Sequence, residues 1–229
     1  MPETLAQRAY RTIRHKLEEG AFAPGTRLVN RTLAKEIGIS PIPVREALNR
    51  LASEGLVSHV SGAGAYVHRP DLHELLELYG MREALEVYAV REAIRNVDEV
   101  ELDSLRAVCA AHREILEVFI ASGRPHGSFD EIRIWMDLEE QFHSRLVAAS
   151  RNRYVGKTIR NLRLMSRVFG RFRQSCEWLS PLEATRTCDE HEGIVAAVAL
   201  RDVDLACRLI AEHVGNTRAE LLRYFSRPH

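Results

Sequence analysis

The first seventy residues change from a helical repeat to a strand repeat, and this change limits the possible folds more than any other feature. Apolar residues recur every four positions over residues 5–17, which predicts an amphipathic helix over residues 4–20. A second helix is predicted over residues 30–38 with Asn30 as its cap, and a third over residues 44–52. Three short helices alone do not specify a fold, so the fold assignment depends on the residues that follow them.

Two short strands are predicted after Gly55, over residues 56–60 and 65–68. Residues 61–64 read Ser-Gly-Ala-Gly, which is typical of a tight turn. Three helices, a short second-to-third connection and a terminal hairpin describe a winged helix-turn-helix over residues 1–70.

The exposed face of the third helix suits a polyanion. Arg45 and Asn49 share a face that points away from the apolar residues of that helix. Residues 1–70 carry ten basic and six acidic side chains, a net charge of +4, although the whole chain is neutral. An arginine presented by a helix in the major groove contacts phosphate or guanine, so we expect DNA binding. A solvated charged face, on a module that binds protein instead of DNA, is the alternative.

Residues 71–229 show helical periodicity almost throughout. The predicted helices span residues 72–96, 98–122, 129–150, 153–176, 181–200 and 203–224. The fold class is therefore mainly α, with the winged helix-turn-helix followed by an all-helical bundle domain of six to seven helices.

Composition excludes a membrane protein and a disulfide-stabilised one. No stretch approaches the roughly 18 apolar residues of a membrane span, and the N-terminus lacks an apolar signal core. The four cysteines, at positions 109, 176, 188 and 207, form no Cys-x-x-Cys pair and are expected to be small buried hydrophobes. We expect a cytoplasmic protein without a membrane partner.

A carboxylate and three histidines in the second part form a candidate metal site. Glu139 and His143 lie four residues apart on one helix face, whereas His191 and His213 belong to two later helices. Such a donor set suits a divalent ion such as Zn, Ni or Mn. The sequence leaves open that the four residues are unrelated, each packed in the core.

A metal-dependent bundle enzyme is the second alternative. Glu140 and His143 match half of a di-iron carboxylate motif. The second half is missing, because Cys188 and Ile210 stand three residues before His191 and His213. We therefore expect a protein that is not an enzyme and has no catalytic residues.

The N-terminal part resembles the GntR family of bacterial regulators. The shared motifs are Pro24-Gly25-Thr26-Arg27-Leu28, Leu33-Ala34, Pro43-Val44-Arg45-Glu46-Ala47-Leu48, Glu54-Gly55-Leu56-Val57 and Gly62-Ala63-Gly64-Ala65-Tyr66-Val67. The resemblance implies DNA contacts at Arg31, Ser40, Arg45 and Gly62. The chain departs from the family at Pro41 and Ile42, where arginine and threonine are common, and this leaves the base preference open.

Residues 72–225 are similar to the ligand-sensing FCD domain of the FadR branch of that family. The motifs are Leu138-Glu139-Glu140-Gln141-Phe142-His143, Glu190-His191 with Ile194-Val195, and Arg82 with Leu85-Glu86. The resemblance implies a metal held by Glu139, His143, His191 and His213. The usual acidic ligand is Asp, so Glu139 is a departure, and the nearby Asp137 is a weaker candidate.

The resemblance also implies how such a protein works. It predicts a homodimeric regulator, more often a repressor, that binds double-stranded operator DNA through residues 1–70. Residues 71–229 would form the effector-binding and dimerisation domain. A small organic or sugar acid would fill open metal positions. Arg82 would either pair with this anion or form a structural salt bridge to a neighbouring helix.

Overall fold

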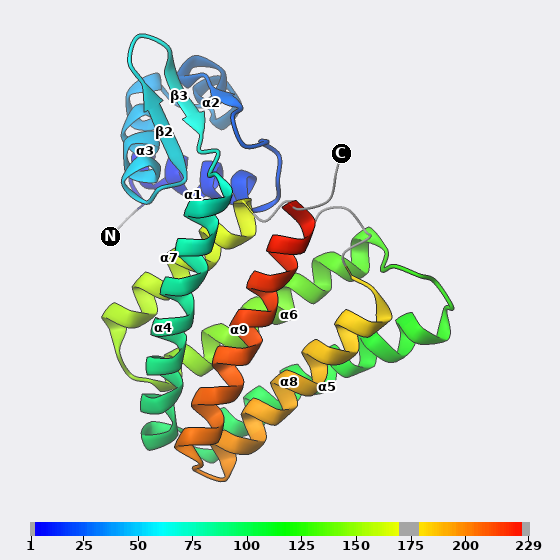
Figure 1. Ribbon diagram of the computed structural model, residues 1–229. Helices are drawn as coiled ribbons and strands as arrows, with labels where there is room; N and C mark the ends of the chain where they lie inside the picture. Colours follow the sequence, from blue (N-terminus) through cyan, green and yellow to red (C-terminus); the bar gives the residue numbers. More distant parts are fainter. Residues whose placement is uncertain (1–2, 170–178, 226–229) are drawn as a thin grey trace. The chain divides into compact units, whose positions relative to one another are not determined.

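The computed structural model describes residues 3–169 and 179–225, which form two compact units. The first, here called the winged unit, comprises the chain up to His73 together with a short segment that begins at Leu164. The second, here called the helical unit, begins at Glu74 and contains the remaining helices. Each unit is described by itself (Figure 1).

The winged unit contains three helices and a three-stranded antiparallel sheet. In chain order these are α1 (Leu5–Glu18), β1 (Arg27–Leu28), α2 (Asn30–Ile37), α3 (Pro41–Ser53), β2 (Val57–Val60) and β3 (Gly64–Val67). The strand order is β1-β3-β2, and Arg27 is opposite Tyr66 while Val57 is opposite Val67. The predicted winged helix-turn-helix is confirmed.

One apolar core joins these elements because each contributes its periodic face. The fully buried residues include Ala9, Ile13, Leu17, Val44, Leu48, Leu51 and Leu56. Helix α1 packs on α3, and α2 packs on α3 as well. The helix that carries Arg45 is therefore held on two sides.

Three details of the winged unit differ from the sequence predictions. The two-residue strand β1 was not predicted, because two residues carry no detectable repeat. Helix α2 is capped by Val29 rather than Asn30, and its first turn has no side-chain cap. Helix α3 begins at Pro41, three residues earlier than predicted, because prolines in a first turn lack only N–H groups that would have no helical partner.

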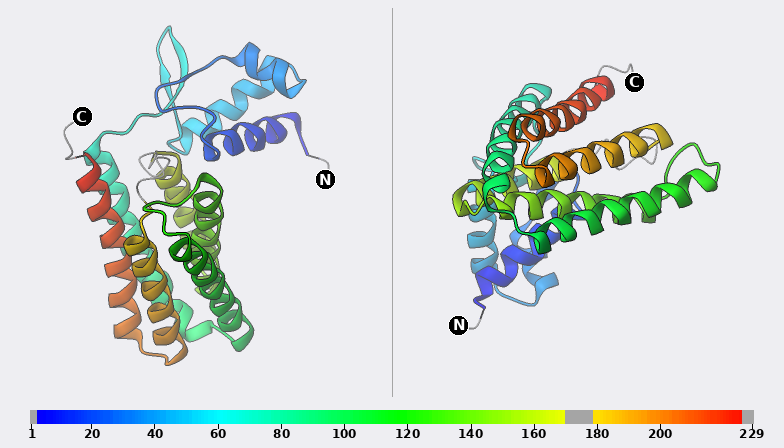
Figure 2. Two further views of the ribbon diagram at one scale, coloured as in Figure 1. Left: turned by 90° about the vertical axis from the view of Figure 1, so that its right-hand side faces the viewer. Right: turned by 90° about the horizontal axis from the view of Figure 1, so that it is seen from below.

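The helical unit is built from long helices, as predicted. They are α4 (Leu72–Asn96), α5 (Glu99–Ala121), α6 (Phe129–Ala149), α7 (Arg153–Phe169), α8 (Pro181–Ala199) and α9 (Val203–Phe225), of which the ends of α4 and α7 are grouped with the winged unit. Helix α5 packs against α6 and α8, and α8 packs against α9 (Figure 2). The predicted continuation of α7 to Cys176 lies outside the described residues.

Capping boxes set the starts of three of these helices. Asp98, Ser128 and Ser180 each accept a hydrogen bond from the backbone N–H three residues later, and a glutamate there bonds back. Each box satisfies N–H groups that have no partner within the helix. The first residues of α5, α6 and α8 are therefore defined by local sequence.

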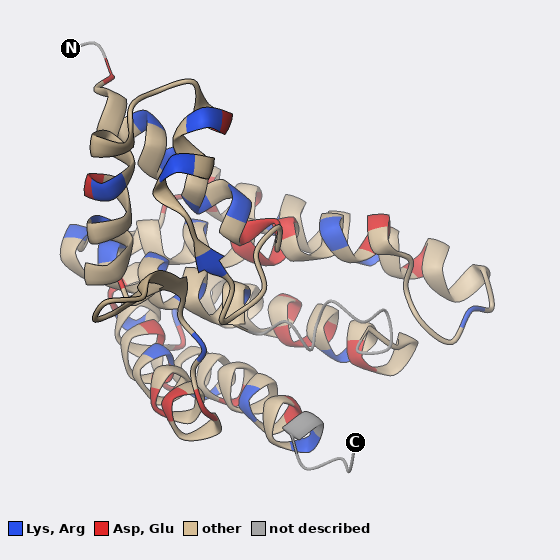
Figure 3. Ribbon diagram, turned by 90° about the horizontal axis from the view of Figure 1, so that it is seen from above, with Lys and Arg blue, Asp and Glu red and all other residues tan. Residues whose placement is uncertain are grey.

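The interior of the helical unit is apolar around its centre. Phe142, Ile194, Val198 and Ile210 are among the fully buried residues that bring α6, α8 and α9 together. Cys109 and Cys188 are buried free thiols, as predicted, and Cys207 is a half-buried one. Among the described helices none is long and apolar enough to cross a membrane. Acidic and basic positions are both distributed along the helices (Figure 3).

Replacing a core residue of the winged unit should destabilise that unit strongly. Leu51 is fully buried on α3, so Leu51→Ala should lower the free energy of unfolding by about 2–5 kcal/mol. Arg45→Ala on the same helix, where the side chain is exposed, should change it by no more than about 0.5 kcal/mol. Urea denaturation of both variants measures the difference, and equal midpoints would contradict this packing.

Candidate DNA-binding surface and metal centre

Helix α3 presents its polar face to solvent. Arg45 and Asn49 are exposed, whereas Val44 and Leu48 on the opposite face are buried. Ser40 is the N-cap of α3 and is exposed, and its hydroxyl makes no cap hydrogen bond. The positions predicted to contact DNA on this helix are therefore accessible.

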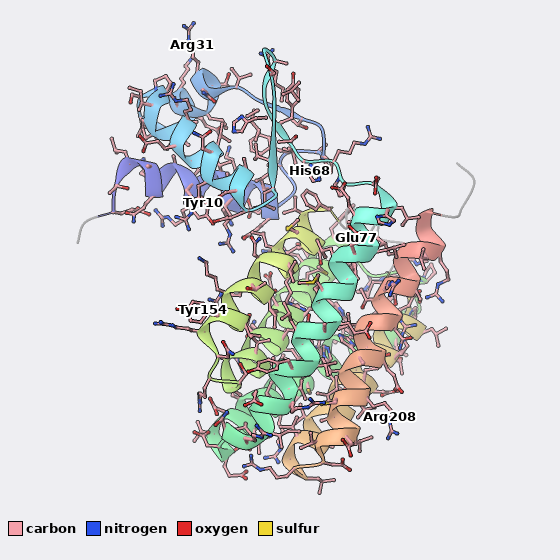
Figure 4. The ribbon with its side chains drawn as sticks, turned by 60° about the vertical axis from the view of Figure 1, so that its left-hand side comes forward. Tyr10, Arg31, His68, Glu77, Tyr154 and Arg208 are labelled. Carbon is pink, nitrogen blue, oxygen red and sulfur yellow. The ribbon has the colours of Figure 1, made fainter. Side chains whose placement is uncertain are left out.

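A hollow lies beside this exposed face and is lined by basic side chains. Its polar lining residues are Arg27, Asn30, Arg31, Arg45, Asn49 and His59. No aspartate or glutamate lines it. The hollow brings together three of the predicted DNA-contact residues, Arg31, Arg45 and Asn49, whereas Ser40 and Gly62 do not line it. Figure 4 shows Arg31 extending outward from α2. Such a surface attracts phosphate groups.

The turn between β2 and β3 forms the tip of the wing. Gly62 is exposed there, and its φ of +72° is a left-handed backbone conformation that residues other than glycine rarely adopt. A Cβ atom added at Gly64 would lie 3.7 Å from Nε of Arg27, so the guanidinium lies against the start of β3. Arg27 and His59 are lining residues that the sequence argument did not assign to DNA, because β1 was not predicted.

Several other basic side chains of the winged unit have partners within it. Arg8 donates to the carbonyl of Ile37 at 3.0 Å, and Arg14 pairs with Glu18 at 2.9 Å. These two guanidinium groups support the fold of the unit.

The second candidate site lies inside the helical unit. Glu139 and His143 come from α6, His191 from α8 and His213 from α9. One potential ligand atom of each lies within 4.8 Å of the others. The three imidazoles are at most 4% exposed, so three helices place these polar groups in the interior of the unit.

The distances within this cluster, here called the His₃Glu cluster, suit a divalent ion. Nε2 of His143 and Nε2 of His213 are 3.1 Å apart, and Nε2 of His191 is 3.5 Å from Oε1 of Glu139. Two ligands of a tetrahedral zinc ion lie about 3.3 Å apart, given metal–nitrogen distances of about 2.0–2.1 Å. Both ring nitrogens of His191 and Oε1 of Glu139 are buried without a hydrogen-bond partner. Buried nitrogen and oxygen atoms without a hydrogen-bond partner are suited to bind a metal ion.

Burial favours the neutral form, which binds metals, in His143 and His191. It lowers the pKa of His143 to about 4, against the opposing charge of Glu86, and lowers the pKa of His191 well below its usual value. Burial alone would raise the pKa of Glu139, but the surrounding imidazoles, His191 foremost, outweigh it and lower that pKa. His143 and His191 therefore offer neutral imidazoles beside an ionised Glu139 carboxylate.

Three residues next to the cluster were not assigned a role from the sequence. Nδ1 of His143 lies 2.6 Å from Oε2 of Glu86, and Nδ1 of His213 lies 2.7 Å from Oε2 of Glu190. His112 is fully buried, with Nε2 4.0 Å from Oε1 of Glu139. Glu86 and Glu190 occur within the quoted motifs, but only the folded chain brings them to a histidine on another helix.

The two remaining candidate residues, Arg82 and Asp137, are not members of the His₃Glu cluster. Nε of Arg82 is 3.0 Å from Oε1 of Glu86 one helical turn away, and both side chains are buried. This salt bridge lies within α4 and does not reach a neighbouring helix, which is where the sequence predicted its partner, and an anion would compete with Glu86 for the guanidinium. Asp137 is exposed and lies outside the cluster, so Glu139 is the acidic member.

Comparison with known protein families covers both units. The family described as "Bacterial regulatory proteins, gntR family" matches residues 5–67, and the family described as "FCD domain" matches residues 77–216. The second match alone spans more than half of the chain.

Individual relatives also match most of the chain. The chain is 30% identical over 193 residues to the Nta operon transcriptional regulator of Aminobacter aminovorans, covering 84% of this chain and 83% of the relative. It is 29% identical over 214 residues to the HTH-type transcriptional repressor GlaR of Escherichia coli K12, covering 90% of each. The solved structure of E. coli McbR/YncC has the same fold, with a TM-score of 0.78 at 23% identity, covering 97% of this chain and 99% of that one.

These relatives are transcriptional regulators, which confirms the expectation that the chain is not an enzyme. The matched families follow the order of the two units, with the helix-turn-helix first and the helical FCD domain second. The chain therefore belongs to the GntR family of bacterial DNA-binding transcriptional regulators, in the branch that carries a C-terminal FCD domain.

Proposed function

We propose that this regulator binds operator DNA through α3 and the wing, and that a metal-dependent effector site in the helical unit controls that binding. The observation that carries the proposal is the pairing of two sites in one chain. One is a basic hollow without acidic side chains, and the other is a buried His₃Glu cluster with unpaired donors.

For DNA, we assign contacts to Arg31, Ser40, Arg45, Asn49 and Gly62. The exposed end of α3 fits the major groove, where Arg45 and Asn49 reach base edges or phosphate. Gly62 lets the backbone at the wing tip approach the sugar-phosphate chain closely. Pro41 and Ile42 contribute neither charge nor a donor, so the base preference rests on Arg45 and Asn49.

For the metal, we assign Glu139, His143, His191 and His213 as ligands of a divalent ion such as Zn, Ni or Mn. Neutral imidazoles and one carboxylate match these borderline ions better than they match Ca or Mg, which prefer oxygen ligands. The ion would act as a Lewis acid with positions left open for a ligand. A glutamate in place of aspartate still offers an oxygen, 3.5 Å from His191 Nε2 and 3.8 Å from His143 Nε2.

The effector we propose is a small organic or sugar acid whose carboxylate completes the metal coordination. A ligand of this kind shifts operator affinity only through unequal binding to two states of the protein. Arg82 assists such an anion only by exchanging its bond to Glu86.

We also propose a homodimer that acts as a repressor. Two helix-turn-helix heads read two half-sites about one helical turn apart, so the symmetry of an operator matches that of a dimer. The relative GlaR is named a repressor, and its alignment covers both units of the present chain.

Removing the Arg45 side chain should weaken operator binding. We expect Arg45→Ala to cost about 1–3 kcal/mol, which is roughly a tenfold to hundredfold loss of affinity. Fluorescence anisotropy with a duplex selected by the intact protein from genomic fragments measures this. The control is Arg11→Ala, which removes an exposed arginine of α1 that pairs with Glu3.

Unchanged affinity in Arg45→Ala, with Arg11→Ala equally unchanged, would remove Arg45 from the interface. Binding that does not weaken with added salt would contradict DNA recognition by the winged unit altogether, because phosphate contacts release counterions.

Removing one imidazole should empty the metal site. His191→Ala should lower the metal content of the purified protein to a small fraction of the wild-type value, because His191 contributes one of four ligands. Elemental analysis measures this content, and His126→Ala, in the loop before α6 and outside the cluster, is the control. Full occupancy in His191→Ala would show that the metal lies elsewhere.

The metal-free protein should lose stability in mild acid. The pKa of His143 is 6.5 in the unfolded reference and about 4 when folded, so the unfolded chain binds the extra proton in that range. This contribution is complete above about pH 6.5 and disappears as the pH falls towards about 4. The urea midpoint, measured with a chelator present, should therefore fall over this range.

His143→Gln should reduce that pH dependence, whereas His15→Gln on the exposed side of α1 should leave it as in the wild type. A midpoint that is constant over the same range would contradict a neutral buried His143.

A further inference from the structure

Two histidines of the His₃Glu cluster each have a carboxylate on the side away from the other cluster residues, and these carboxylates are the buried Glu86 and the half-buried Glu190. An imidazole has two ring nitrogens, and an ion in the cluster binds only the one that faces it. Oε2 of Glu190 lies 2.7 Å from Nδ1 of His213 in a hydrogen bond, and Oε2 of Glu86 lies 2.6 Å from Nδ1 of His143 in an ion-pair contact that is not aligned as a hydrogen bond. An ionised carboxylate only accepts hydrogen bonds, so it favours a proton on Nδ1.

The opposite edges of these two rings then meet. With Nδ1 protonated and the ring neutral, Nε2 carries the free lone pair. The two Nε2 atoms are 3.1 Å apart, so both lone pairs are directed into the same small space. Two such nitrogens repel each other unless a cation lies between them.

The two carboxylates are themselves held in the same manner. Each uses one oxygen for the histidine and the other for a donor on its own or a neighbouring helix. Oε1 of Glu190 accepts from Nδ2 of Asn216 at 2.6 Å, and Oε1 of Glu86 accepts from Nε of Arg82 at 3.0 Å. The second oxygen of each carboxylate is thereby kept towards its imidazole.

His191 is held differently. Its ring stacks on Phe142, with centroids 3.7 Å apart and planes 11° from parallel, and neither ring nitrogen has a hydrogen-bond partner. Orientation by a carboxylate is therefore a property of His143 and His213, and it involves α4 and α8 in a site whose ligands lie on α6, α8 and α9.

We infer that Glu86 and Glu190 are positioning residues for metal capture, which present Nε2 of His143 and Nε2 of His213 to the same ion. The inference rests on the proposed metal site and deepens it. Carboxylates behind metal-binding histidines fix the tautomer and orientation of the ring, and their loss typically costs about 10- to 100-fold in metal affinity.

Glu190 gives the sharper test, because Glu86 also neutralises the buried Arg82. In Glu190→Gln the amide oxygen takes over the bond to Asn216 and the NH₂ group faces His213. Nδ1 of His213 must then accept a hydrogen bond from this NH₂ group, so the ring proton moves to Nε2. Nε2 then lacks the free lone pair that an ion in the cluster would bind. The matched control is Glu192→Gln, two residues along α8, whose carboxylate pairs with Arg113 at 2.8 Å.

The experiment uses the full chain, stripped of metal, with Zn²⁺ alone as the probe. Competition with a chromophoric chelator gives the affinity, and ¹⁵N spectra of the metal-free protein at alkaline pH give the tautomer of His213. We expect Glu190→Gln to bind Zn²⁺ about 10- to 100-fold more weakly and to shift His213 towards the Nε2–H form. Glu192→Gln should match the wild type in both measurements.

A Glu190→Gln affinity within twofold of the wild type, or an unchanged tautomer, would overturn the positioning role while leaving the metal site standing. A wild-type protein that binds no Zn²⁺ would overturn the metal site and the inference together. Glu86→Gln should show the same loss of affinity, and if that variant fails to fold, Glu190→Gln decides.

Discussion

Three imidazoles and a carboxylate meet inside a bundle whose interior is mostly apolar, and further buried polar side chains, Arg82, Glu86 and His112, lie there as well. Burying polar atoms without partners costs a few kcal/mol each. In this chain a carboxylate lies against two of the rings, Glu190 at 2.7 Å from His213 and Glu86 at 2.6 Å from His143. The buried atoms without a hydrogen-bond partner include both ring nitrogens of His191 and Oε1 of Glu139, which lie where an ion would be bound.

The same contacts connect the cluster to other helices. Glu86 belongs to α4, the helix that starts five residues after β3 ends. If a metal binds His143 as proposed, a change in its coordination would reach α4 through Glu86, and α4 is joined to the wing by a short connection. We propose this chain continuity as the route by which an effector at the metal site would influence DNA binding.

Most of the fold could be predicted from the sequence, because its signals are local. The repeat of four in α1, the glycine turn before β3 and the cap at Asp98 each depend on residues close together in the chain. The strand β1 could not be predicted, since its two residues are defined only by pairing with β3. The cap at Asn30 was wrong because Val29 takes that position.

The candidate sites were predictable to a lesser degree. Helical periodicity placed Arg45 and Asn49 on the exposed face, and the family resemblance named the four metal-site residues. Periodicity alone did not predict that His191 and His213 lie close to Glu139, because contacts between helices depend on how the bundle packs. For the same reason Glu86, Glu190 and His112 had no sequence signal as neighbours of the cluster.

The most direct test of a metal in this cluster is an anomalous diffraction map from crystals of the protein grown with Zn²⁺. Our account predicts one strong peak about 2.0–2.2 Å from Nε2 of His143, His191 and His213 and from a carboxylate oxygen of Glu139. A map without density among these four side chains, at an ion concentration that saturates the protein in solution, would contradict it.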